Sequence, residues 1–124
     1  MSKQNFFLRF FIPITPFLMF GLFGQLLGQS GNNELSEAVK NGAFLVDVRT
    51  PGEFSGGSVP GAVNIPLDQV SSQIARFKGK KGVVVFCKSG MRSGQAKSIL
   101  DQNGIPQVIN GGTWQNVNKL VGQQ

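Results

Sequence analysis

The sequence predicts an α/β domain in which helices flank a mostly parallel central sheet. Short apolar runs typical of buried strands alternate along the chain with stretches that have helical spacing or helix-capping residues. This alternation is the pattern of parallel sheets. The chain has 124 residues, which suits one domain. Apolar residues make up 40% of it and charged residues 15%, so it has enough apolar surface to form a core.

The first predicted elements are a helix from Glu34 to Lys40 and a strand over residues 43–48. Asn33 or Ser36 can cap the helix, because either side chain can accept a hydrogen bond from a free N–H group of its first turn. The strand is a nearly continuous apolar run, as expected of a strand that is buried on both faces.

A short helical turn at residues 51–55 and a strand over residues 62–65 come next. Thr50 stands before the turn as its cap, and Glu53 occupies the capping-box position. Pro66 ends the strand, because it cannot donate a hydrogen bond to a sheet.

The remaining elements are two helices, 67–77 and 93–102, and two strands, 82–86 and 107–109. The first of these helices has one apolar face at helical spacing, formed by Leu67, Val70, Ile74 and Phe77. The strand over 82–86 is apolar throughout, and Asn103-Gly104 ends the helix that follows it.

Residues 1–30 form a separate segment with the pattern of a secretory signal peptide. Lys3 and Arg9 give it a basic start, and residues 10–27 are almost entirely apolar. We expect cleavage after Ser30. The alternatives are an uncleaved membrane anchor through residues 10–27 or an apolar arm packed on the domain. Cleavage or anchoring would place the domain, residues 31–124, in the periplasm or on the periplasmic face of the inner membrane.

The residue counts exclude several classes of site. The chain has no histidine and no tyrosine, so Ser-His-Asp catalysis, Cys-His catalysis and imidazole-bound metals are ruled out. A single cysteine also excludes an intrachain disulfide and a zinc site with several thiolates. No nucleotide or flavin motif is present, so we expect no cofactor.

Positive charge is concentrated in the second half of the chain. The net charge is +6, and no acidic residue lies between Val70 and Leu100. The basic residues of that stretch are Arg76, Lys78, Lys80, Lys81, Lys88, Arg92 and Lys97. Such a field attracts anions. We do not expect nucleic acid as a partner, because aromatic residues are not interleaved with the basic ones.

The candidate catalytic residue is Cys87, at the carboxyl end of the strand over 82–86. In parallel sheets, ligands bind at this end of the strands. Ser89 and Gly90 are small, and Gly90 can adopt a positive φ, so backbone N–H groups of the loop can converge on the sulfur. The alternative is that Cys87 is a small buried apolar residue, which is the commoner role of a lone cysteine.

Positive charge around the loop would favour the thiolate over the thiol. The helix that begins near Ser93 directs its free N–H groups at the loop, and Lys88 and Arg92 add full charges. We therefore predict that the pKa of Cys87 lies below its usual value of about 8.5.

Asp47 and Arg49 lie at the carboxyl end of the strand over 43–48, at the same edge of the predicted sheet. We interpret them as an ion pair that ties the strand end to its loop. The alternative is that they contact the substrate, since loops at strand ends often carry sites.

Three segments give the chain a specific resemblance to the single-domain rhodaneses, which are thiosulfate sulfurtransferases. They are LVDVRTPGEFSGGSVPGAVNIPL at 45–67, VVVFCKSGMRSGQAKSIL at 83–100 and GIPQVINGGTW at 104–114. With the predicted export signal, the chain is most similar to the small periplasmic rhodaneses of the phage-shock-protein E type. The resemblance implies the rhodanese-like three-layer fold. The sequence departs from many members at Ser58, where they have a histidine, and in the spacing of Trp114 from the glycine pair.

The resemblance implies a two-step transfer of sulfur. Cys87 takes the outer sulfur of thiosulfate, becomes a persulfide, and passes the sulfur to cyanide or to a thiol. It also implies that the loop binds the anionic substrate through Lys88, Ser89, Gly90, Met91, Arg92 and Ser93. Lys88 and Arg92 would attract the sulfonate end, and Met91 would influence the choice of acceptor.

Two other functions compete with this interpretation. A phosphatase or arsenate reductase would have five residues between the cysteine and the arginine, whereas four separate Cys87 from Arg92. The second is a non-catalytic rhodanese-like binding module, or a carrier that delivers the persulfide to a protein partner, because a fold does not determine a function.

Overall fold

The computed structural model describes residues 32–123, and the predicted signal peptide or anchor at residues 1–30 lies outside them. The elements of the described part are α3 (Asn32–Lys40), β1 (Phe44–Asp47), α4 (Pro51–Ser55), β2 (Val63–Asn64), α5 (Leu67–Val70), the 3-10 helix η1 (Ser71–Phe77), β3 (Val83–Cys87), α6 (Met91–Gln102), β4 (Val108–Thr113) and α7 (Trp114–Gly122). No helix of this part is both long enough and apolar enough to cross a membrane.

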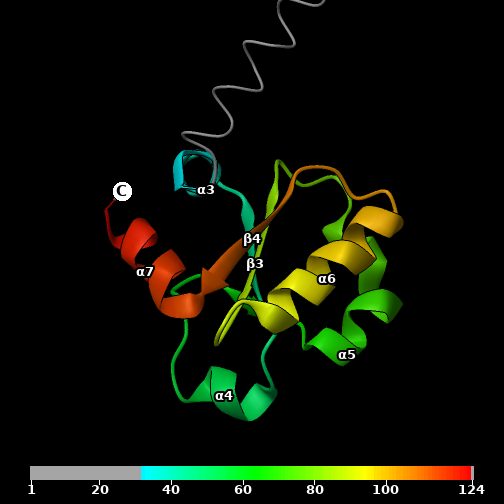
Figure 1. Cartoon of the computed structure of the whole chain (residues 1–124), viewed down its shortest axis with the longest axis horizontal. Coiled ribbons are helices and arrows are strands. Elements are labelled where there is room, and N and C mark those ends of the chain that lie inside the picture. Colours follow the sequence, from blue (N-terminus) through cyan, green and yellow to red (C-terminus); the bar gives the residue numbers. More distant parts are fainter. Residues whose placement is uncertain (1–31, 124) are drawn as a thin grey trace, which may run out of the picture. The chain divides into compact units, whose positions relative to one another are not determined.

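The four strands form one parallel sheet in the order β2-β1-β3-β4. Helices cover both faces, with α5 and α6 on one side and α3 and α7 on the other (Figure 1). The predicted α/β architecture with a parallel central sheet is confirmed. All four strands point the same way, so their carboxyl ends meet at one edge, and the loops after β1 and β3 lie there together.

Alternation along β3 divides the core into two layers. Val83, Val85 and Cys87 belong to the cluster that includes Leu100 of α6, whereas Val84 and Phe86 belong to the cluster on the other face. All five β3 residues are at most 1% exposed. A strand covered on both faces must be apolar throughout, which explains the unbroken run of the sequence.

Several predicted boundaries are wrong. The helix predicted over 67–77 is divided, because Gln73 has non-helical φ and ψ values and the second part is a 3-10 helix. The helix predicted from 93 begins at Met91, directly after the left-handed Gly90. Helix α3 begins at Asn32, so neither Asn33 nor Ser36 precedes it as a cap.

The carboxyl-terminal part of the fold was also predicted incompletely. The strand predicted over 107–109 extends to Thr113 as β4, and α7 was not predicted. Thr113 caps α7 by accepting a hydrogen bond from the Asn116 N–H at 3.1 Å. Gly111 and Gly112 have no side chains that could show the alternation of a strand, so the second half of β4 could not be recognised from the sequence.

Candidate active site

Cys87 is the last residue of β3, and it lies at the carboxyl edge of the sheet with its side chain on the α6 face. It is fully buried and free. The side chain continues the apolar row formed by Val83 and Val85. The core therefore fixes the position of the sulfur on one side, and the loop to α6 encloses it on the other.

Two groups of that loop and of α6 contact the sulfur. The Gly90 N–H donates to Sγ at 3.0 Å, and the Ser93 hydroxyl lies 3.5 Å from Sγ. Gly90 has φ of +100°, so its conformation strongly favours glycine. A Cβ at this position would make an ordinary van der Waals contact with the Gly112 Cα at 3.6 Å, so the backbone conformation and not the available space favours glycine. The predicted convergence of backbone N–H groups on Cys87 is present at Gly90.

The hydrogen bonds stabilise the thiolate. Burial by itself would raise the pKa of Cys87, but hydrogen bonds from Ser93, Gly90 and Ser89 outweigh it and lower the pKa to about 7. The direction is the predicted one. A substantial fraction of Cys87 is therefore ionised at neutral pH without a histidine beside it.

Asn110 of β4 holds the loop in place, and the sequence interpretation did not identify it. Its side-chain oxygen accepts from the Ser93 hydroxyl at 2.7 Å and from the Gly112 N–H at 2.9 Å. Its amide nitrogen donates to the Gly90 carbonyl at 3.1 Å. Asn110 thus fixes both residues that contact the sulfur.

A β-bulge brings Asn110 to this position. Val85 pairs with Asn110 and Phe86 pairs with Gly112, so Gly111 is an extra residue in β4. Bulges are common beside active sites because they redirect a side chain. Only glycine fits at 111, since a Cβ there would lie 2.7 Å from Val117 Cγ2 and 3.0 Å from Val84 Cγ1. The sequence signal that could have indicated this bulge is an asparagine followed by two glycines.

Replacing Ser93 with alanine is expected to raise the pKa of Cys87 by about one pH unit. Among the groups that lower this pKa, the Ser93 side chain has the largest effect, and a hydrogen bond to a charged group contributes about 1.5–3 kcal/mol. The check is the pH dependence of alkylation by iodoacetamide, whose rate rises with the thiolate fraction. Ser98→Ala, at an exposed position of α6, is the control. Equal midpoints in the two variants would contradict the expectation.

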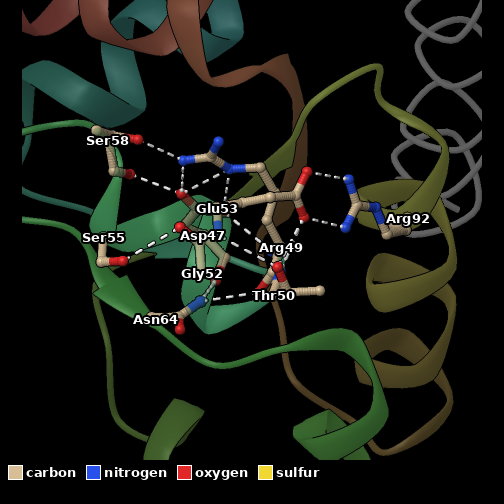
Figure 2. A network of polar contacts seen from close by, with 10 residues as sticks. Asp47, Arg49, Thr50, Gly52, Glu53, Ser55, Ser58, Asn64 and Arg92 are labelled. Carbon is tan, nitrogen blue, oxygen red and sulfur yellow. Dashed lines mark hydrogen bonds and ion pairs between the residues drawn. The ribbon is translucent and has the colours of Figure 1, made fainter.

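The other predicted loop residues differ in exposure. Lys88, Ser89 and Met91 are exposed, and Met91 is 74% exposed. The guanidinium of Arg92, which the resemblance assigns to binding the sulfonate end of the substrate, is paired with Glu53. Its Nη1 and Nη2 donate to the two carboxylate oxygens of Glu53 at 2.7 and 3.1 Å. Figure 2 shows this pairing.

The Glu53–Arg92 pair was missed for a local reason. The capping box of α4 is present as predicted, since the Glu53 N–H donates to the Thr50 hydroxyl and the Thr50 N–H donates to Glu53 Oε1. This local role accounts for Glu53 in the sequence, whereas Arg92 lies 39 residues further along the chain. The hydrogen bond to Arg92 lowers the pKa of Glu53 to about 2.

Asp47 and Arg49 form the predicted ion pair, and it is buried (Figure 2). The Arg49 Nε and Nη2 donate to the carboxylate at 2.7–3.0 Å. Ser58 donates to Asp47 Oδ2 at 2.6 Å, and Arg49 Nη2 also donates to the Gly57 carbonyl. The guanidinium carbon lies 5.1 Å from the centre of the Trp114 ring. This network joins β1 to the loop before β2 and to the start of α7.

A hollow of about 330 Å³ lies beside Arg92 at the carboxyl end of β1. Its lining residues are Val48, Thr50, Pro66, Leu67, Asp68 and Arg92. Within residues 32–123, no group of three His, Cys, Asp or Glu side chains could hold a metal ion.

The chain is similar to several known proteins. It is 44% identical over 69 residues to thiosulfate sulfurtransferase PspE of Escherichia coli, covering 54% of this chain and 66% of the relative. It is 38% identical over 67 residues to a sulfurtransferase of Allochromatium vinosum, covering 54% and 63%. A protein of Bacillus subtilis, YqhL, is 41% identical over 68 residues, covering 55% and 54%. The chain thus spans about half to two thirds of the length of these relatives.

Solved structures agree with these similarities. A rhodanese from E. coli, solved with anions, has a TM-score of 0.54 at 40% identity, covering 59% of this chain and 88% of that one. The human single-domain sulfurtransferase TSTD1 has a TM-score of 0.57 at 29% identity, covering 68% and 89%. The protein-family model for the rhodanese-like domain matches residues 31–115, which is more than half of the sequence. The chain therefore belongs to the family of rhodanese-like domains.

Proposed function

We propose that the chain is a sulfurtransferase that takes a sulfur atom from thiosulfate onto Cys87 and passes it to cyanide or to a thiol. The observation that carries this proposal is the sulfur of Cys87 with the Gly90 N–H at 3.0 Å and the Ser93 hydroxyl at 3.5 Å. These groups supply hydrogen bonds to an anionic sulfur. Substitution at sulfur needs an ionised nucleophile and no proton transfer.

The bond changes balance in both steps. In the first, the Cys87 thiolate forms a bond to the outer sulfur of thiosulfate, and the sulfur–sulfur bond of the donor breaks with its electron pair leaving on sulfite. In the second, cyanide or a thiolate attacks the outer sulfur of the Cys87 persulfide. Thiocyanate or a new persulfide leaves, and the Cys87 thiolate returns. No external oxidant or reductant takes part.

The loop stabilises charge in each state. The Gly90 N–H is held toward the sulfur by the positive φ of Gly90 and by the hydrogen bond from Asn110 to its carbonyl. Such preorganised donors favour the charged intermediate without rearranging during the reaction. We also propose that the reaction takes place in the periplasm, since a basic start followed by an apolar run in residues 1–30 supports export.

The test is the intact mass of the full chain after incubation with thiosulfate. We expect a gain of one sulfur atom, which cyanide then removes, and no gain in Cys87→Ser. The mass of the protein recovered from cells also reports whether residues 1–30 have been removed. A folded and reduced protein that gains no sulfur would contradict thiosulfate as the donor. Turnover of p-nitrophenyl phosphate, which we expect to be absent, would favour a phosphatase instead.

A further inference from the structure

The guanidinium of Arg92 forms an ion pair with the carboxylate of Glu53. The two side chains are about one third exposed, and Nη1 and Nη2 of Arg92 each donate to a different carboxylate oxygen of Glu53. Such two-pronged pairs are the geometrically strongest contacts between arginine and a carboxylate. An incoming anion would have to displace the carboxylate or share the guanidinium with it.

Glu53 is also held from its other side. Its Oε1 accepts from the Thr50 N–H at 3.0 Å and from the Thr50 hydroxyl at 3.2 Å. The cap of α4 therefore fixes the carboxylate where Arg92 meets it. Because the hydrogen bond to Arg92 lowers the pKa of Glu53 to about 2, the carboxylate is charged throughout the neutral range.

Arg92 is electrostatically coupled to the sulfur. The hydrogen bond to Glu53 raises the pKa of Arg92, and the charge of Cys87 raises it further. Arg92 lies in the first turn of α6, beside Ser93, which contacts the sulfur. A change in the net charge of the Glu53–Arg92 pair will therefore be felt by a charged molecule that approaches Cys87.

We propose that Glu53 is a specificity-determining residue, because its carboxylate competes with an anionic sulfur donor for Arg92. The site then discriminates against anionic reagents relative to uncharged ones of the same size. This inference builds on the proposed function, since it concerns the charge of the donor at the same sulfur. It assigns to Glu53, the capping-box residue of α4, a second role, in which it lowers the attraction of the basic loop for anions.

The test compares two alkylating reagents of similar size, iodoacetate with a negative charge and iodoacetamide without one. The measured quantity is the ratio of their rates with Cys87 in the full chain at low ionic strength. The thiolate fraction affects both rates equally and cancels from the ratio. In Glu53→Gln, we expect the ratio of iodoacetate to iodoacetamide to rise about two- to fivefold, as one removed charge near the site implies in a solvated environment. Added salt should reduce the rise.

Glutamine is the suitable replacement because it also serves in capping boxes, so the cap of α4 is retained. Glu37→Gln is the matched control. It removes the same charge from α3, where Glu37 is exposed and pairs only loosely with Lys40 at 3.8 Å. We expect this control to leave the ratio unchanged. A ratio that is also unchanged in Glu53→Gln would show a purely structural role and overturn the proposal.

The competition for Arg92 is tested by repeating the substitution in an Arg92→Gln background. If Glu53 acts by occupying Arg92, its removal there will raise the ratio less than in the wild-type chain. An equal rise in both backgrounds would overturn the competition. With thiosulfate, Glu53→Gln should lower KM. A protein that shows the expected alkylation ratios but never accepts sulfur from thiosulfate would contradict the proposed function and leave this inference standing.

Discussion

Replacing Cys87 with serine is expected to abolish sulfur transfer, by at least roughly a thousandfold, as when other catalytic nucleophiles are removed. The serine hydroxyl is not ionised at neutral pH and cannot hold the sulfur as a persulfide. The check is kcat/KM with thiosulfate and cyanide, together with a single-turnover measurement of sulfite release. The latter isolates the first half of the reaction.

The fold should tolerate this change. Serine is close in size to cysteine, and in the buried site its hydroxyl would find the Gly90 N–H and the Ser93 hydroxyl as partners. We therefore expect a urea unfolding midpoint close to that of the wild-type chain, so lost activity cannot be attributed to unfolding. Sulfur transfer retained by a folded Cys87→Ser would refute Cys87 as the nucleophile.

The second large effect is on stability. Asp47→Ala is expected to lower the free energy of unfolding by about 3–5 kcal/mol, because it removes one partner of a buried ion pair and leaves the other charge uncompensated. Asp47 is fully buried and Arg49 is 5% exposed. Ser58 and the Arg49 N–H would also lose the acceptor to which they donate. The free energy of unfolding of a typical domain is only about 5–15 kcal/mol in total.

The measurement is urea unfolding of the full chain followed by circular dichroism. Asp101→Ala is the matched control, since it breaks the exposed pair with Lys97 at 2.8 Å within α6. An exposed pair of this kind contributes at most about 0.5 kcal/mol. If both variants unfold at similar urea concentrations, Asp47 and Arg49 do not stabilise the fold as a buried pair.

The features that were predictable from the sequence are encoded within a few residues. The run that ends at Cys87 shows a strand covered on both faces, and Thr50 with Glu53 shows the capping box. Asp47 and Arg49 are two residues apart, so their pairing could also be inferred. The parallel sheet follows from the alternation of such local patterns.

The remaining features depend on contacts between distant segments. The pairing of Glu53 with Arg92 could not be inferred, because each residue already had a local explanation, Glu53 in the capping box of α4 and Arg92 as a cation of the loop after Cys87. Asn110 reaches Gly90 and Ser93 only because of the bulge at Gly111. At the bulge, Gly111 packs against Val117 and against Val84 of the neighbouring strand, and Val84 lies far from it in the sequence.

The Ser93 hydroxyl has a single proton and two neighbours that can accept it, Cys87 Sγ and Asn110 Oδ1. With the neutral thiol, a continuous chain is satisfied, in which sulfur donates to Ser93 and Ser93 donates to Asn110. Once sulfur loses its proton, the Ser93 hydroxyl can turn to donate to it, because Asn110 Oδ1 still accepts from the Gly112 N–H. The rotation of one hydroxyl then moves a hydrogen bond from Asn110 to the thiolate, which agrees with the lowered pKa of Cys87. A thiolate whose pKa lies near neutral pH is a weaker leaving group, but a more reactive nucleophile, than a strongly acidic one would be.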